Sequence, residues 1–232
     1  MDGSHVPGPR RRPPEGGYAR GAETRDRIIE AAYVVFAEEG YLGASTRRIA
    51  AEAGVNPPAL QYYFDSKEGL HKACAEAVVA HVAGQLSEAT QAAQAALDAP
   101  DRAGAAPALA DLVVRLAEVA MAEAETEAWS HFLNRCQADD SGPAFEIIEA
   151  GISAPFKSLV IGLVAKTLGL PAADEEARLR GILLMSQLNA FHTHREKLLA
   201  LLGWEDFAGE RAAEAMAVLR DHVYRLTAPR GA

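Results

Sequence analysis

The chain has 232 residues, of which 49% are hydrophobic and 24% are charged, and its formal net charge is −9. These values are ordinary for a globular protein, and the length can hold one large domain or two small ones. No uninterrupted apolar run approaches the ~20 residues of a membrane span, and the start of the chain lacks the apolar segment of a secretory signal. Two cysteines are too few for a disulfide framework. We therefore expect a cytoplasmic protein with no membrane partner.

The charge is unevenly distributed along the chain. Residues 1–83 carry 10 Lys and Arg against 11 Asp and Glu, whereas the remainder carries 13 against 21. An almost neutral N-terminal third can still present a positive face if its acidic side chains point elsewhere. The acidic balance therefore does not exclude a nucleic-acid partner for this third.

The first 22 residues hold four prolines and five glycines, a composition that predicts a disordered tail. Arg10, Arg11 and Arg12 within it admit two interpretations, an arm that enters a DNA minor groove or a solvated extension, and the second is the commoner case. A helix is predicted over residues 23–39, because apolar residues recur there at helical spacing, and Gly40 is placed to end it.

Two short helices follow at residues 46–53 and 57–64. Ser45 and Asn56 are suitable N-cap residues, and Pro57 suits the first position of a helix. A fourth helix begins at Asp65 or Ser66 and extends towards Leu97.

Beyond a linker at residues 98–107 the pattern stays helical and no strand alternation occurs. Pro155 predicts a kink, and residues 180–190 are apolar nearly all round, so that helix must be covered on more than one side. The remaining helices are predicted at 108–124, 126–137, 143–169, 174–202 and 207–227.

Two short helices joined by a Gly-containing turn and packed on a longer helix form a helix-turn-helix, whose second helix enters the DNA major groove. Leu60 and Phe64 would pack inward while Gln61 and Tyr62 project outward. Arg47 can reach a guanine edge or a phosphate, and Tyr63 and Lys67 offer donors to phosphates. The alternative is an ordinary three-helix cap with solvated polar residues.

The stretch RDRIIEAAYVVFAEEGYLGASTRRIAAEAGVNPPALQYYFDSKEGLHKA (residues 25–73) resembles the DNA-binding domain of the TetR family of bacterial regulators. The resemblance implies an all-α homodimer with a three-helix helix-turn-helix DNA-binding domain at residues 23–70 and a helical ligand-sensing and dimerisation domain at 71–228. It implies a regulator that binds double-stranded DNA at a palindromic operator. By motif position, Thr46 and Lys67 match backbone-contacting residues, whereas Arg47, Pro57, Ala59 and Tyr62 match groove-facing residues.

Gln61 departs from this pattern, because many members carry tyrosine there, and an amide favours base reading over phosphate contact. The later stretches SHFLNRCQADDSGPAFEIIEAGISAP (130–155) and EEARLRGILLMSQLNAFHTHREKLLALLGWEDF (175–207) resemble the C-terminal domain of the CecR-like subgroup, although more loosely. The effector does not transfer with this resemblance.

We expect a small, partly apolar effector to bind in the C-terminal domain. His131 and Arg135, four residues apart on one helix face, could together hold an acidic group. The alternative is that the aromatic residues are ordinary core. Dimerisation is expected through helices 143–169 and 174–202, with Leu183 in the interface. The candidate ligand-binding residues are Met121, Trp129, His131, Phe132, Arg135, Met185, Gln187, Phe191 and His192.

The pair His192 and His194 could suggest a metal site, but residues two apart on a helix do not face each other. Cys136 could be a reactive thiol, although its apolar neighbours favour a structural role. No catalytic or cofactor-binding motif occurs, so we expect no cofactor and no enzyme activity. The sequence thus favours a ligand-responsive transcriptional repressor over two alternatives, an all-α enzyme centred on His131, Arg135 and His192, and an interaction protein that has lost DNA binding.

Overall fold

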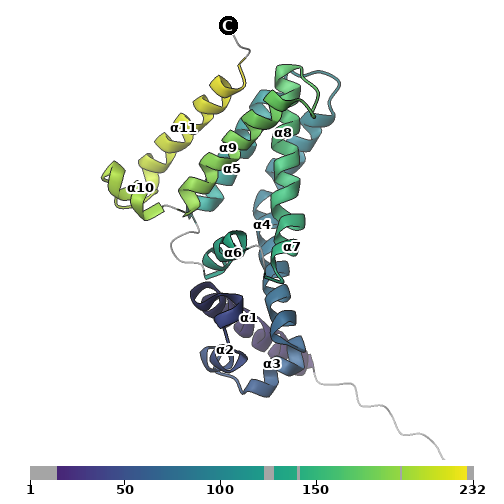
Figure 1. The fold of residues 1–232 in the computed structure, drawn as a ribbon, viewed down its shortest axis with the longest axis vertical. Coiled ribbons are helices and arrows are strands. Elements are labelled where there is room, and N and C mark those ends of the chain that lie inside the picture. Colours follow the sequence, from purple (N-terminus) through teal and green to yellow (C-terminus); the bar gives the residue numbers. More distant parts are fainter. Residues whose placement is uncertain (1–14, 123–127, 140–141, 194, 229–232) are drawn as a thin grey trace, which may run out of the picture.

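The structure is a computed structural model that describes residues 15–122, 128–139, 142–193 and 195–228. Every regular element in these ranges is helical, which confirms the predicted all-α fold. Figure 1 shows an elongated molecule with α1, α2 and α3 at one end and a larger helical bundle at the other. The elements are α1 (Glu15–Gly43), α2 (Thr46–Glu52), α3 (Pro57–Phe64), α4 (Lys67–Asp98), α5 (Ala105–Ala122), α6 (Ala128–Ala138), α7 (Phe145–Ile148), the π-helical turn η1 (Glu149–Ser153), α8 (Ala154–Leu168), α9 (Glu175–Thr193), α10 (Arg195–Leu202) and α11 (Gly209–Leu226).

Three polar side chains begin the short helices of the head, which we define as α1–α3 with the first turn of α4. Each accepts a hydrogen bond from the backbone N–H three residues later and so satisfies a donor that a helix start leaves unpaired. The predicted inward positions of Leu60 and Phe64 are confirmed, since both are buried. The capping bonds join Ser45 to Arg48 (3.2 Å), Asn56 to Ala59 (3.2 Å) and Ser66 to Gly69 (2.9 Å).

α1 begins at Glu15 rather than at residue 23, so the predicted disordered tail is shorter than expected. The Gly-rich composition that predicted disorder says nothing of tertiary contacts, and Gly21 lies beside the Tyr63 hydroxyl of α3. The regular part of α1 ends where predicted, because Gly40 has a φ of 70°, which L side chains rarely adopt.

α4 belongs to both parts of the molecule, because it starts in the head and continues into the larger bundle, here called the body (Figure 1). Its far end is fixed by α8. The Lys166 ammonium donates to the carbonyls of Ala96 (2.8 Å), Leu97 (2.9 Å) and Ala99. A cation at this end also complements the helix dipole. The predicted linker is shorter than expected, since α5 already begins at the fully buried Ala105.

The predicted kink near Pro155 takes the form of the π-helical turn η1, which lies directly before that proline. Proline lacks the N–H that would continue the α-helical ladder, and a π turn is one way for a helix to absorb such a break. The stretch Phe145–Leu168 is long and apolar enough to cross a membrane by length and composition, which the sequence analysis did not expect of any segment. It packs against α4, α5 and α9, so its apolar residues serve the core of the body.

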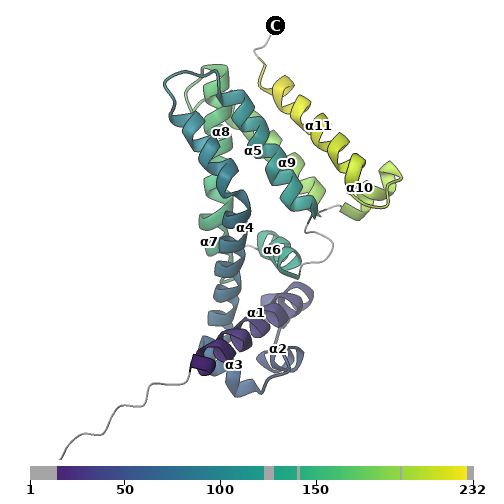
Figure 2. The same cartoon turned by 180° about the vertical axis from the view of Figure 1, so that it is seen from behind.

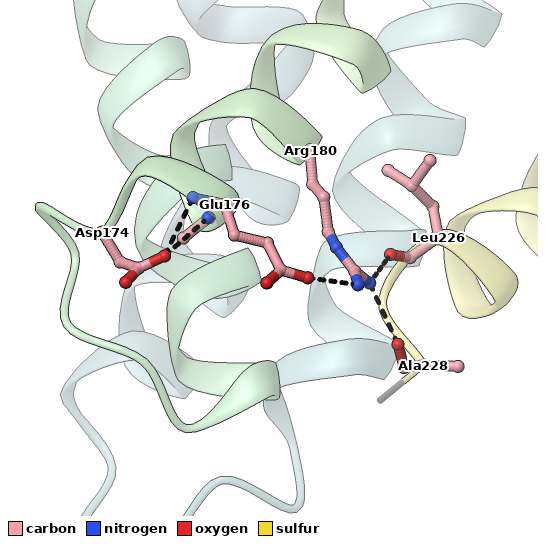
Figure 3. Close-up of polar contacts among 6 residues, drawn as sticks. Asp174, Glu176, Arg180, Leu226 and Ala228 are labelled. Atoms are coloured by element: carbon pink, nitrogen blue, oxygen red, sulfur yellow. Dashed lines mark hydrogen bonds and ion pairs between the residues drawn. The ribbon is translucent and has the colours of Figure 1, made fainter. Parts of the chain in front are cut away.

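Within the predicted helix 174–202 the structure describes α9 and α10, and α9 is tied to α11 by Arg180 (Figure 3). The Arg180 guanidinium bonds to Glu176 at 2.5 Å and donates to the carbonyls of Leu226 and, at 3.0 Å, of Ala228. Asp174 caps the start of α9 by accepting from the N–H of Glu176 at 2.9 Å. These bonds hold the C-terminal end of α11 on the first turn of α9.

α6 lies between the head and the body (Figure 2) and packs extensively on α1. Phe132 on α6 is fully buried, with its ring centroid 5.4 Å from Tyr33 and 6.1 Å from Phe36, both on α1. His71 of α4 completes this aromatic cluster, with ring centroids 4.6 Å from Phe36 and 5.2 Å from Phe132. The head and the body are therefore joined by a close-packed contact as well as by α4.

Candidate nucleic-acid interface and cavity

The exposed residues of α2 and α3 form a candidate nucleic-acid interface. Arg47 and Gln61 are exposed, and Tyr62 keeps 81% of its surface accessible, which is unusual for a large aromatic side chain. The structure brings these residues onto the two helices of the predicted helix-turn-helix. Thr46 and Pro57 are also exposed, at the starts of α2 and α3, and Ala59 is half-buried.

Arg48 next to Arg47 has a different role, which the sequence analysis did not assign. Its guanidinium bonds to Glu52 at 2.8 Å and lies 3.7 Å from both Glu38 and Glu39. Three acidic residues of the head are thus grouped around one arginine. This arrangement explains how the almost neutral N-terminal third, residues 1–83, can leave Arg47 to face a phosphate or a base.

Lys67 was predicted to contact phosphate, but its ammonium is engaged within the head. It donates to the carbonyls of Tyr41 (2.8 Å) and Ala44 (3.1 Å) and lies 4.6 Å from the centre of the Tyr41 ring. Lys67 therefore holds the end of α1 to α4 and keeps at most one N–H for DNA. Tyr63 is half-buried and packs edge-to-face on Tyr62, with ring centroids 5.0 Å apart.

A cavity of about 680 Å³ lies in the body, within the size range of small-molecule sites. Its apolar walls come from α4, α5, α6, the α7–η1–α8 stretch and α9. Charged residues enter it from η1 and α8, where the Lys157 ammonium bonds to the Glu149 carboxylate at 2.9 Å. That bond and one from Ser153 lower the pKa of Glu149, so this carboxyl group is ionised at neutral pH.

Two of the candidate ligand-binding residues, Trp129 and Met185, line this cavity. The other described candidates lie elsewhere. The sequence could not place them, because helix periodicity alone does not show which face of a helix a neighbouring helix covers. Phe132 belongs to the aromatic cluster at the head, and Gln187 lies 2.9 Å from His222 Nε2 of α11. The buried Met121 and the exposed His131 are not among the cavity residues. The side chains of Phe191 and His192 lie outside the described residues.

Arg135, predicted to anchor an acidic ligand, points towards the head instead. Its guanidinium lies over Gly40, where a Cβ atom would come 2.8 Å from a guanidinium nitrogen. The structure therefore does not bring His131 and Arg135 to this cavity, because the close approach of α6 to α1 decides where that helix face points. The cavity residues Gln137, Glu149, Ser153 and Lys157 were missed, since their polar pattern resembles that of a solvated helix face.

Cys136 fits the structural interpretation rather than the reactive one. It is buried, its sulfur lies 3.9 Å from His71 Nε2, and burial raises the pKa of its thiol to about 12. Cys74 is also buried, and burial raises its pKa as well. No cluster of potential metal ligands occurs among the described residues, which exclude His194.

A helix-turn-helix with exposed groove-facing residues, joined to a helical body that encloses an apolar cavity, defines the class of ligand-sensing DNA-binding regulators. Residues 28–74 match the family of bacterial regulatory proteins named tetR, and residues 105–228 match the C-terminal domain of the HTH-type transcriptional dual regulator CecR. The chain is 30% identical over 197 residues to CecR of Shigella flexneri, which covers 83% of this chain and 86% of that protein. The chain belongs to the TetR family of transcriptional regulators, with a CecR-type C-terminal domain.

Other relatives agree with this membership. The probable regulator YttP of Bacillus subtilis (strain 168) is 47% identical over 47 residues, 20% of this chain and 23% of that protein. The crystal structure of AibR in complex with isovaleryl coenzyme A and operator DNA has a TM-score of 0.61 at 15% identity and covers 89% of this chain and 99% of that one. Bacillus subtilis FadR in complex with stearoyl-CoA has a TM-score of 0.56 at 16% identity, covering 87% and 96%. Both share the fold.

The protein is therefore a DNA-binding transcriptional regulator, and it is not an enzyme. The predicted alternatives of an all-α enzyme and of an interaction protein without DNA binding are set aside by this family membership.

Proposed function

We propose that the protein represses transcription from a palindromic operator and leaves it when a small molecule occupies the cavity of the body. The observation that carries this proposal is the double role of α6. One face of α6, with Trp129, lines the cavity, and Phe132 and Arg135 on the same helix pack on α1 of the head. A ligand that moves α6 must then also move the head.

Such coupling requires the ligand to favour one arrangement of the two heads over the other, because equal affinity for both shifts nothing. A second connection between the cavity wall and the head, through α4, supports the proposal. Gly151 of η1 lies so close to α4 that a Cβ atom would come 2.6 Å from Val79 Cγ1. The cavity wall therefore contacts both α4 and α6, the two helices that lead to the head.

For DNA recognition we propose that Arg47, Gln61 and Tyr62 enter the major groove, with Thr46, Pro57, Ala59 and Tyr63 beside them. We further propose a DNA-binding domain at residues 23–70 and a ligand-binding and dimerisation domain at 71–228. The unbroken course of α4 across residue 70 supports a rigid connection between the two. A bacterial regulator that binds DNA is also proposed to be cytoplasmic.

We propose that two copies associate through α9 and α11. Leu179, Ile182, Leu183 and Val218 expose between 45% and 65% of their surfaces on these helices. Such apolar exposure is typical of an interface. The sequence analysis had paired 174–202 with 143–169, but Leu163 and Val164 of α8 are fully buried in the body. Gly181 of α9 lies against Ile161 of α8, so this small residue serves packing within the body.

The dimer is tested by sedimentation velocity at micromolar concentration. A Leu183→Glu variant should sediment as a folded monomer, whereas Leu201→Glu, at a residue of α10 that is 82% exposed, should remain dimeric. A monomeric wild-type protein, or a Leu183→Glu variant that stays dimeric, would contradict this interface.

The proposed release from DNA is tested with a variant that fills the cavity. Ala120 of α5 lines it, and Ala120→Phe should occupy the space that a ligand needs. Operator affinity should stay within about threefold of wild type, while ligand-induced release is lost. Leu201→Phe, at the exposed residue of α10 outside the proposed dimer interface, is the control and should still respond. A normal response of Ala120→Phe would show that the ligand binds elsewhere.

A further inference from the structure

The polar lining residues of the cavity come from α6 (Ser130 and Gln137), η1, α8 and α9. Residues from α4 and α5 in the wall, such as Leu86, Leu116 and Val119, are apolar. On α9 the hydroxyl of Ser186 already donates to the carbonyl of Ile182 at 2.8 Å. The charged lining residues are Glu149 of η1 and Lys157 of α8. A ligand in the cavity therefore meets an apolar surface over most of its length and a charged pair at one place.

The two charges of this pair neutralise each other. Glu149 and Lys157 are eight residues apart, and eight residues of a regular α-helix would leave them about 80° apart around the axis, at 100° per residue. The π turn η1 inserts one extra residue, so that eight residues complete nearly two turns and both side chains share a face. The break in the helix thus creates a matched ion pair with 2.9 Å between nitrogen and oxygen.

A ligand that carries its own charge into this part of the cavity must compete with that pair. An anion that binds Lys157 leaves Glu149 without its ammonium partner, and a cation that binds Glu149 leaves Lys157 without its carboxylate. An uncompensated charge beside an apolar wall is costly, although the partial exposure of both side chains, 37% for Glu149 and 54% for Lys157, moderates the cost. A neutral polar group can accept from Lys157 or donate to Glu149 while the pair stays intact.

We propose that the cavity selects molecules whose buried part is uncharged and mostly apolar, with one neutral polar group such as a hydroxyl, carbonyl or amide placed at the Glu149–Lys157 pair. This proposal rests on the proposed function, because it concerns the same cavity. It replaces the acid-binding anchor expected at His131 and Arg135.

The probes are decan-1-ol, decanoate and decylamine, which share a chain length and differ in charge at pH 7. Binding is followed by the fluorescence of Trp129 in the wall, in a Trp204→Phe background, because Trp204 packs on Phe207 away from the cavity. The protein with wild-type Glu149 and Lys157 should bind decan-1-ol at least about tenfold more tightly than decanoate or decylamine. Since a neutral chain also enters any apolar space more readily than an ion, the decisive comparison is between variants.

Glu149→Gln should tighten decanoate binding by about tenfold, because Lys157 is then free to pair with the carboxylate, and Lys157→Gln should do the same for decylamine. Decan-1-ol binding should change by less than about threefold in both. An ion pair with only a structural role would not make one variant prefer decanoate and the other prefer decylamine. Glu68→Gln and Lys72→Gln, at an exposed pair on α4 with 2.5 Å between nitrogen and oxygen, are matched controls and should change nothing.

The proposal is overturned if decanoate or decylamine binds the wild-type pair as tightly as decan-1-ol, if the two variants do not exchange their charge preference, or if none of the three probes binds. Operator release is measured separately by fluorescence anisotropy of labelled operator DNA. If decan-1-ol binds as expected but the protein stays on DNA, the proposed function fails while the assignment of the cavity holds.

Discussion

The head and the body are both built from helices, but they differ in how closely their interiors are packed. In the head, α2 and α3 are only 7 and 8 residues long, and each begins with a side-chain cap. Arg48 ties α2 to α1, and Lys67 ties the end of α1 to α4. The body has longer helices and leaves about 680 Å³ between them. Short helices are marginal on their own, so the head depends on many local fixings, whereas long packed helices tolerate an internal space.

This difference matches the two tasks. A surface that reads DNA must hold its side chains in fixed positions, and a sensor must have an arrangement that a ligand can change. The aromatic cluster of Phe36, His71 and Phe132 lies where the two parts meet and belongs, by its packing, with the head. The predictions below test whether the contrast between packed junction and open cavity is real.

The largest effect is expected at Phe132. Phe132→Ala removes a fully buried ring and should lower the free energy of unfolding by about 3–5 kcal/mol. Met185→Ala in the cavity wall should cost less than about 2 kcal/mol, because that side chain already borders empty space. Chemical denaturation followed by circular dichroism measures both. Equal losses at the two sites would contradict the contrast.

The next effect is a pH dependence caused by His71. Burial, and secondly the charge of Lys67, lower the pKa of His71 to about 4, whereas Asp139 acts weakly in the opposite direction. In the unfolded chain the imidazole of His71 binds a proton as the pH falls below about 6.5, whereas in the folded protein it stays neutral until about pH 4. The free energy of unfolding is therefore undiminished by His71 above pH 6.5 and decreases as the pH drops towards 4. The loss should amount to about 3 kcal/mol at most.

His71→Leu should remove that part of the acid sensitivity, while the part caused by other groups remains. The measurement is the free energy of unfolding of both proteins between pH 7 and pH 4. Parallel pH profiles for wild type and variant would show that His71 is protonated in the folded state.

Lys67 and Arg47 should separate structure from DNA contact within the head. Lys67→Met removes two charge-assisted bonds to carbonyls and should destabilise the protein by about 1.5–3 kcal/mol, with little change in the salt dependence of DNA binding. Arg47→Ala should leave stability unchanged and weaken operator binding by about 1–3 kcal/mol. Thermal unfolding and salt-titrated operator binding distinguish the two. If the operator affinity of Lys67→Met depends less steeply on salt concentration than that of wild type, Lys67 does contact a phosphate.

The smallest effect is expected at a helix cap. Asn56→Ala removes the acceptor for the Ala59 N–H at the start of α3 and should cost about 1 kcal/mol. Asn56→Asp keeps that acceptor and should cost little, which makes it the matched control. The midpoint of thermal unfolding reports both. If the two variants lose the same stability, the cap does not hold the recognition helix.

The sequence by itself determined the head. Caps at Ser45 and Asn56, the apolar residues Leu60 and Phe64, and Gly40 at the end of the regular helix act over a few residues, so their consequences can be predicted from spacing. The all-α fold and the long course of α4 followed from helical periodicity in the same way.

Only the tertiary structure decided which faces of the body helices line the cavity. Trp129 and Phe132 are three residues apart on α6, yet one borders the cavity and the other joins the head. Arg135 and Lys67 were assigned to ligands but bind the protein's own backbone or lie against it. The pairing of Glu149 with Lys157 depends on a π turn, whereas Pro155 predicted only that the helix would kink. The physical reason is that periodicity gives the apolar face of a helix, whereas the partner of that face depends on how distant helices pack.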